Sequence, residues 1–280
     1  MKKILENRKM VRSFIIILFF IWCNNLFAQE KFDRRIIIEN DTFYAVEINH
    51  ETQLAKLFTG SINEPIDSAA VYALPAGSRR MVMNPFPFAW DLYGDTLYCI
   101  NYTAYAQNSH INSLKSIPVS TLEMYDPAEK PVKKLMQAAY ANNKVQNLPL
   151  IKTYKKYIYM DDLYFDLIVN KGVIYQFICV KNELTVWKYE NMNWEQSEII
   201  PFVTEGYFSV YAAGNSFRLL KSNGDVYLYP DNILIPCGTA CPRPEDVILV
   251  ENRKTNEVVT IQHHFFDDTS QSLTEILKKN

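Results

Sequence analysis

Four short stretches of this 280-residue chain share one pattern, in which an apolar run leads into a turn of Asn, Asp or Gly and out into an apolar-aromatic run. Asn, Asp and Gly tolerate the positive φ of tight hairpin turns, and β-branched and aromatic residues fit a half-buried pleated surface. Each stretch therefore predicts a β-hairpin. The four stretches are 36–44, 90–98, 167–175 and 210–217.

The hairpin pattern recurs at long intervals, with turns near Asp41, Asp95, Lys171 and Asn215 that lie 54, 76 and 44 residues apart. After each turn comes a further run with the period-2 alternation of a half-buried strand. The pattern therefore predicts repeated four-stranded antiparallel meanders, followed by a last hairpin over 247–262. The further strand-like runs are 53–58, 121–125, 184–189 and 225–229.

Units of about 40 to 55 residues with four strands each resemble the blades of β-propellers in general. No Trp-Asp or double-Gly blade signature occurs, so the resemblance is architectural and indicates no particular family. We predict an all-β fold of about five blades in a single domain over 29–280, closed by a strand at 34–40. An irregular β-sandwich is the alternative. Short peripheral helices are expected at 132–141 and 270–279.

The first 28 residues have the three-part layout of a secretory signal. Five basic residues precede an apolar run at 14–22, which is far shorter than the ~20 residues of a spanning helix. We expect cleavage after Ala28 and a mature protein that is secreted, periplasmic or at the cell surface, with no transmembrane segment. Lipid attachment at Cys23 is disfavoured because bulky Trp22 precedes it, and an uncleaved anchor is the other alternative.

Charge and composition narrow the class of partner. Without residues 1–28 the chain has 24 basic and 30 acidic residues, a net charge of −6. Nucleic-acid binding needs a basic face that displaces counterions, so nucleic acid is not an expected partner. The 48% hydrophobic share supports a sizeable core. The sequence leaves the oligomeric state open.

Two kinds of cysteine follow the predicted leader. Cys99 and Cys179 lie inside apolar strand runs and are expected to be buried thiols. Cys237 and Cys241 flank a short loop bounded by prolines, where an exported protein could form a local disulfide. No His or second Cys pair lies near these two thiols in sequence, so we predict no metal site there.

Motifs for nucleophilic or cofactor chemistry do not occur in the sequence. It contains no Gly-x-Ser-x-Gly elbow and no glycine-rich phosphate loop, so we predict no cofactor. His263 and His264 are neighbours at an expected strand end, where successive side chains point to opposite faces and cannot share a metal ion.

Carboxylates are the one catalytic alternative, because five-bladed propellers include glycoside hydrolases whose inner-strand acids converge on a central funnel. Asp91, Asp162 and Asp166 lie on or near predicted strands before hairpin turns. Asp91 lies three residues before Gly94, and Asp166 lies four residues before Asn170. Because side chains alternate between the two faces of a strand, we expect these two aspartates on different strand faces. The chain also lacks the Asn-Asp-Pro-type motif of such hydrolases, so turn-capping is the preferred interpretation of these residues.

An aromatic loop is the best candidate for ligand contact, because Tyr and Trp rings combine apolar area with a polar tip. Its candidate ligand-binding residues are Phe86, Phe88, Trp90 and Tyr93. We therefore predict an exported protein of the bacterial envelope that binds a protein or a glycan and is not an enzyme. The alternative is a glycan-active hydrolase or lyase that uses the three aspartates.

Overall fold

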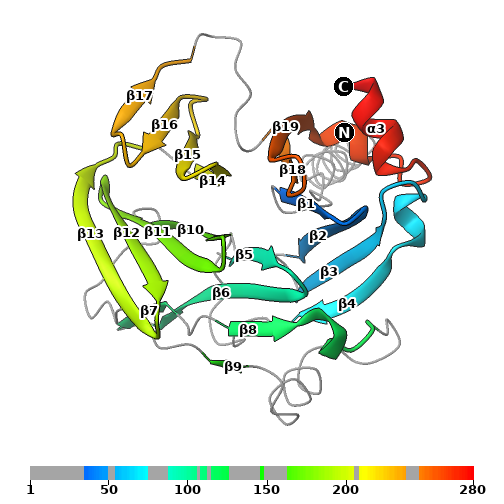
Figure 1. The fold of residues 1–280 in the computed structure, drawn as a ribbon, viewed down its shortest axis with the longest axis horizontal. Coiled ribbons are helices and arrows are strands. Elements are labelled where there is room, and N and C mark those ends of the chain that lie inside the picture. Colours follow the sequence, from blue (N-terminus) through cyan, green and yellow to red (C-terminus); the bar gives the residue numbers. More distant parts are fainter. Residues whose placement is uncertain are drawn as a thin grey trace, which may run out of the picture. The chain divides into compact units, whose positions relative to one another are not determined.

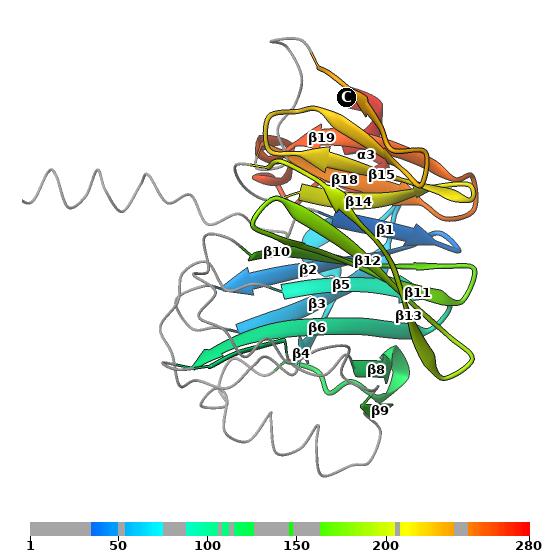
Figure 2. The same cartoon turned by 90° about the vertical axis from the view of Figure 1, so that its left-hand side faces the viewer.

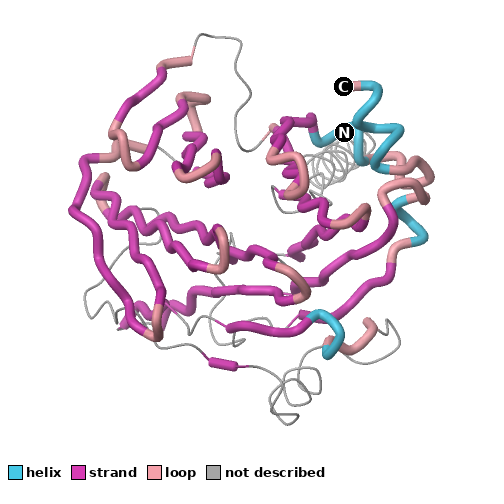
Figure 3. Tube along the Cα trace, viewed as in Figure 1, coloured by secondary structure: helices cyan, strands magenta, loops and turns pink. Residues whose placement is uncertain are grey.

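A computed structural model describes residues 35–49, 54–74, 88–105, 108–111, 115–125, 146–147, 163–204, 208–237 and 246–280. These residues belong to one compact unit, Lys31–Asn280, and most of them are in β-strands (Figure 3). The predicted signal at 1–28 and the expected helix at 132–141 lie outside the described residues and stay predictions. So do the positions of Phe86, Asp162 and Cys241.

The strands form four sheets around a common centre (Figure 1). The third sheet is β10 (Leu163–Asn170), β11 (Val173–Val180), β12 (Glu183–Glu190) and β13 (Asn193–Pro201). The fourth sheet is β14 (Phe208–Ala213), β15 (Ser216–Lys221), β16 (Val226–Tyr229) and β17 (Ile233–Ile235). Both are antiparallel meanders in chain order, as the sequence predicts.

The second sheet has the order β5-β6-β8-β9, and β7 pairs with the far end of β6. Its strands are β5 (Phe88–Tyr93), β6 (Thr96–Tyr105), β7 (Asn108–Ile111), β8 (Lys115–Pro118) and β9 (Gln146–Asn147). The strand predicted at 121–125 is not observed there, because β8 ends in a 3₁₀ turn, η2 (Val119–Thr121).

The first sheet joins the two ends of the compact unit, in the order β19-β18-β1-β2-β3-β4. Strand β1 pairs with β18 in parallel, with Ile36 opposite Val250. The strands are β1 (Arg35–Glu39), β2 (Thr42–Asn49), β3 (Leu54–Ser61), β4 (Ala70–Leu74), β18 (Val247–Asn252) and β19 (Glu257–Gln262).

The structure is therefore an all-β propeller-like fold with four blades, not the predicted five or so. The C-terminal hairpin β18–β19 does not form a separate blade, because β18 hydrogen-bonds to β1 and extends the first sheet. The closing strand predicted at 34–40 is observed as β1, but it lies between β18 and β2 and does not complete an outer blade.

The inner hairpins have the turns that the sequence predicts. Asn40 and Asp41 have φ of 50° and 61°, and Lys171 and Gly172 have φ of 52° and 78°. Positive φ at both turn positions matches the twist of the flanking strands. Gly94 provides the positive φ in the β5–β6 turn. Figure 2 shows the inner hairpin turns on the same side of the compact unit.

Hydrophobic clusters fill the spaces between neighbouring sheets. The cluster between the first and second sheets includes Leu57 and Leu92, and the cluster between the second and third includes Ala89 and Leu167. The third and fourth sheets meet in a cluster with several aromatic rings, including Phe177. The fourth sheet contacts β18 and β19 through a smaller cluster. Face-to-face packing of this kind fixes the inner strands relative to one another.

Short helical segments pack against the first sheet. They include η1 (Ile66–Ser68), η4 (His263–Phe266) and α3 (Leu273–Lys279). Helix α3 packs Leu273 and Ile276 on the outer cluster of this sheet. Its N-cap is Ser272, in a capping box with Glu275, so the helix begins three residues later than predicted. Within the described residues, no helix is long and apolar enough to cross a membrane.

The cysteines differ as the sequence predicts. Cys99 and Cys179 are buried and are not part of a disulfide, and burial raises the pKa of Cys179 to about 11. The Cys179 thiol is therefore inert, because its reactive thiolate form is scarce at neutral pH. Cys237 is disulfide-bonded, and its predicted partner Cys241 lies outside the described residues.

One outer hairpin turn carries a residue that is unfavourable there. Met192 has a φ of 61° and is 87% exposed. Because the left-handed conformation costs a residue with a Cβ about 1 kcal/mol, Met192→Gly should raise the free energy of unfolding by roughly that amount. Urea unfolding measures the change. The control is Met124→Gly at an exposed bridge position outside the positive-φ set, where a loss of stability is expected. Equal effects would contradict the strain argument.

Candidate functional site

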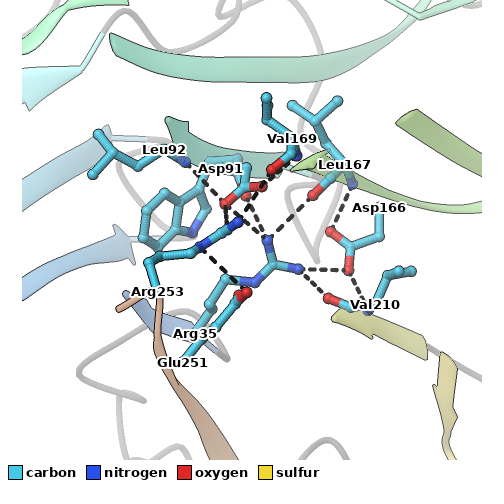
Figure 4. A network of polar contacts seen from close by, with 10 residues as sticks. Arg35, Asp91, Leu92, Asp166, Leu167, Val169, Val210, Glu251 and Arg253 are labelled. Carbon is cyan, nitrogen blue, oxygen red and sulfur yellow. Dashed lines mark hydrogen bonds and ion pairs between the residues drawn. The ribbon is translucent and has the colours of Figure 1, made fainter. Parts of the chain in front are cut away.

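The guanidinium of Arg35 lies where the four innermost strands meet (Figure 4). From β1 it donates hydrogen bonds to the backbone carbonyls of Trp90 on β5 (3.3 Å), Leu167 on β10 (3.2 Å) and Val210 on β14 (2.5 Å). It also pairs with Asp91 (3.4 Å) and Asp166 (3.2 Å). A single side chain therefore connects the first sheet to the other three.

Asp91 and Asp166 each connect an inner strand to the next one. The Asp91 carboxylate on β5 accepts a hydrogen bond from the N–H of Val169 on β10 at 2.5 Å. The Asp166 carboxylate on β10 accepts one from the N–H of Val210 on β14 at 2.7 Å. The same contact is thus made twice, one blade apart.

The expectation that these two aspartates lie on different strand faces is wrong. The β10–β11 turn consists of Lys171 and Gly172, so Asn170 is still a strand residue. Asp91 lies two residues before the last residue of its strand, and Asp166 lies four before the last residue of its own. Both offsets are even, so the two side chains have equivalent orientations.

Arg253 supplies a second guanidinium from the turn between β18 and β19. It pairs with Asp91 at 2.6 Å and donates to the carbonyl of Val169 at 3.1 Å. Its Nε lies 3.2 Å from the Glu251 carboxylate as an ion pair, although not in hydrogen-bond geometry. The contacts of Arg253 with Asp91 and Val169 connect the β18–β19 hairpin to β5 and β10.

We name Arg35, Asp91, Asp166, Glu251 and Arg253 the axial network. Its side chains are largely shielded from water: Asp91 is 0% exposed and Arg35 and Glu251 are each 6% exposed. Isolated charges at such burial would be very costly, so their mutual pairing is what makes the network possible.

Two glutamates of this region have raised pKa values. Burial raises the pKa of Glu251, with Arg253 opposing the shift and Asp91 adding to it. Burial likewise raises the pKa of the neighbouring Glu39, again with Arg253 opposing and Asp91 adding. Glu251 Oε2 makes no hydrogen bond within the described residues. Burial therefore makes the Glu251 carboxyl harder to ionise than an exposed glutamate.

The chemistry open to this site is narrow. Asp91 accepts hydrogen bonds from the N–H groups of Leu92 and Val169 and from Arg253, and Asp166 accepts from Leu167 N–H. A carboxylate whose oxygens accept from several donors has few lone pairs left for a substrate. In the described part of the chain, no group of three His, Cys, Asp or Glu residues could hold a metal ion.

The predicted aromatic residues fall in different places. Trp90 is 2% exposed and belongs to the core between the first two sheets, so its ring is not available to a ligand. Tyr93 is 45% exposed at the end of β5. Phe88 begins β5, and its side chain is outside what the structure describes, as is Phe86.

The sequence interpretation missed Arg35, Glu251 and Arg253. A signal was present, because Arg35 precedes three isoleucines and Glu251 follows Val247–Val250 in a run typical of a fully buried strand. A charge inside such a run must find a partner in the protein interior. Which partner it finds depends on contacts between distant strands.

Comparison with known proteins gives no family. No protein-family model matches the chain, and no curated protein matches it. Among solved structures, it is similar to GH43B of a Bacteroides ovatus xyloglucan PUL, with 11% identity and a TM-score of 0.47 over 83% of this chain and 48% of that one.

Two other solved structures are also similar to the chain. A bifunctional GH43-CE protein of Bacteroides eggerthii has 8% identity and a TM-score of 0.44, over 82% of this chain and 30% of that one. A GH43 β-1,3-galactosidase with galactodeoxynojirimycin has 6% identity and a TM-score of 0.47, over 83% and 85%. The chain thus spans about half of the first structure and under a third of the second. With TM-scores below 0.5, these likenesses assign no activity to it.

Removing the central guanidinium tests the role of the axial network. Arg35→Met leaves Asp91 and Asp166 buried with one cation fewer, so we expect a loss of about 3–5 kcal/mol in the free energy of unfolding, measured in urea. The control is Arg218→Met on β15, whose side chain is exposed and should change stability by less than about 0.5 kcal/mol. Similar losses in both variants would contradict a central role for Arg35.

The raised pKa of Glu251 gives a pH test. Because the folded protein holds this proton more tightly than the unfolded chain, stability falls as pH rises from about 4.5, the ordinary value, through the raised folded pKa. Glu251→Gln should remove this fall and stabilise the protein above that range. Thermal unfolding at a series of pH values measures it.

Glu275 provides a control of opposite sign. Hydrogen bonds from Ser272 lower the pKa of Glu275, so its contribution to stability is present above its ordinary pKa and is lost at lower pH. Glu275→Gln should therefore weaken the protein at neutral pH. A Glu251→Gln profile parallel to that of the wild type would contradict the assignment of the raised pKa.

Proposed function

We propose that this chain is an exported binding protein of the bacterial envelope that holds a glycan on the side of the propeller where the inner turns lie. One observation carries the proposal: donors already surround both inner-strand aspartates, while Tyr93, at the end of β5, is exposed. The axial network then acts as scaffold. Secretion, and a position in the periplasm or at the cell surface, are part of this proposal and rest on the leader pattern at 1–28.

The inner turns support a binding surface because they are joined to one another. Asn170 Nδ2 donates to the Gly214 carbonyl at 3.1 Å, and Lys171 Nζ donates to Asn215 Oδ1 at 2.7 Å. The Tyr93 ring lies close to Gly172, where a Cβ would stand 3.6 Å from ring carbon Cε1. Turns held in this way form a surface that needs little ordering when a ligand binds.

A glycan fits the chemistry of this surface. Tyr93 offers a partly exposed aromatic ring with a hydroxyl, a combination that suits the apolar face and the hydroxyl rim of a sugar. Exposed Asp95, Lys171 and Asn215 lie on the turns around it and supply both donors and acceptors. A neutral polar ligand needs that mixture more than it needs net charge.

Glycan hydrolysis is the second candidate function. It is favoured by the contrast between Asp166, which accepts hydrogen bonds from Arg35 and from backbone N–H groups, and Glu251, whose pKa is raised and whose Oε2 has no hydrogen bond within the described residues. Glycosidases need such a division between a carboxylate and a protonated acid. The burial of the network argues against it, because substrate must reach both groups.

Binding measurements on the mature protein test the first candidate. The ligand panel contains xyloglucan oligosaccharides and β-1,3-galactans. The choice follows the names of two structurally similar proteins, a GH43B of a xyloglucan PUL and a β-1,3-galactosidase. Tyr93→Ala should weaken binding roughly tenfold, as expected for a lost aromatic contact, in isothermal titration calorimetry. Met192→Ala, exposed on another hairpin, is the matched control and should bind as the wild type does.

The same panel decides between the two candidates. Unchanged binding by Tyr93→Ala would place the ligand elsewhere and overturn the proposed surface. Release of reducing sugar by the wild type that is lost in Glu251→Gln, with the fold retained, would establish the hydrolase instead. Binding without sugar release favours the scaffold role of the axial network.

A further inference from the structure

Strand β17 is an exposed apolar edge. It is the outermost strand of the fourth sheet, and among the described strands its partner is β16. Its three residues Ile233, Leu234 and Ile235 are 51%, 47% and 48% exposed. An edge strand presents unpaired N–H and C=O groups, and natural proteins usually protect such an edge by a cover, a charge or a bulge.

Two other sheet edges are covered. The segment after η2 covers β4, since Ala73 N–H donates to the Glu123 carbonyl at 3.1 Å and Tyr125 N–H donates to the Val71 carbonyl at 2.8 Å. At β19 the Asn280 side chain donates to the carbonyl of Thr260 at 3.1 Å. In both places the edge already has hydrogen-bond partners from the same chain.

The edge strand β13 is protected in another way. It carries exposed Glu195 and Gln196, and a charge on an edge strand opposes pairing with another chain. Strand β17 contains neither a charge nor a proline within its bounds. Among the described residues of the edge strands β4, β13, β17 and β19, those of β17 alone have neither a covering segment nor a charge.

We propose that the edge of β17 pairs with the same edge of a second copy of this chain. The sequence Ile-Leu-Ile reads the same in both directions, so an antiparallel pair with a two-fold axis at Leu234 sets Leu234 opposite its own copy and Ile233 opposite Ile235. Two-fold pairing of one surface with itself is the commonest arrangement of protein dimers.

The flanking residues agree with this register. Asp231 precedes the strand by two residues and Cys237 follows it by two, so the two-fold axis sets each Asp231 opposite a Cys237. The Asp231 carboxylates lie at opposite ends of the paired strands, and no like charges face each other. The pair would join two four-stranded sheets into one continuous sheet.

The small size of the edge sets the strength of the dimer. Three residues from each copy are far fewer than the ~20–30 of a standard interface, so the dissociation constant should lie on the order of 10 µM to 1 mM. The proposed dimer does not depend on the proposed glycan. Strand β17 is the outermost strand of the fourth sheet, whereas the inner turn of this sheet follows β14, at the other end of the strand order.

Sedimentation of the mature protein at concentrations up to about 1 mM tests the proposal. The wild type should move from monomer to dimer as concentration rises. Leu234→Lys and Leu234→Glu should each stay monomeric, because like charges then face each other across the axis. An equimolar mixture of the two variants should regain the dimer, since Lys then faces Glu.

Matched measurements make the result decisive. Val259→Lys changes an exposed apolar residue of β19 and should dimerise as the wild type does. Circular dichroism should show that the Leu234 variants keep the fold, since that side chain is half exposed. A wild type that remains monomeric throughout the range, or a dimer that Leu234→Lys leaves intact, would overturn the proposal.

Discussion

Four sheets meet around one buried guanidinium. Backbone hydrogen bonds join strands within each sheet, so contacts between side chains must fix the sheets relative to one another. Apolar clusters supply most of the attraction but little direction. Arg35 supplies direction, because its planar donors reach backbone carbonyls on β5, β10 and β14 at the same time. Asp91 and Asp166 repeat that linkage between neighbouring inner strands.

The same arrangement bears on function. A catalytic carboxylate must be reachable and must exchange partners during a reaction, whereas Asp91 is fully buried and shares its oxygens among guanidinium and backbone donors. Tyr93, in contrast, is partly exposed at the end of β5, and its ring lies close to the turn residue Gly172. Glu251 differs from these aspartates, since burial raises its pKa and its Oε2 has no hydrogen bond within the described residues.

Local features of the fold could be predicted from the sequence, and features that depend on distant contacts could not. Asn, Asp and Gly turns specified the hairpins because their backbone preferences act within a few residues. The predicted blade number was wrong because β18 pairs with β1, which lies more than 200 residues earlier, and no local pattern in the sequence indicates that pairing. The strand face predicted for Asp166 was wrong because the turn was placed one residue too early. Side chains alternate along a strand, so an error of one residue in the turn reverses the face of every residue. The role of Arg35 lies entirely in partners from other sheets.

The parallel pairing of β1 with β18 places neighbours in one sheet that are more than 200 residues apart in the chain. Contacts of such long range make folding slow, because loop-closure entropy is lost before the contact contributes. A growing chain therefore holds β1 with one edge unpaired and the Arg35 guanidinium without most of its acceptors until the inner strands have followed. The hairpin β18–β19 closes the first sheet, and a chain cut before Val247 would leave β1 without its parallel neighbour.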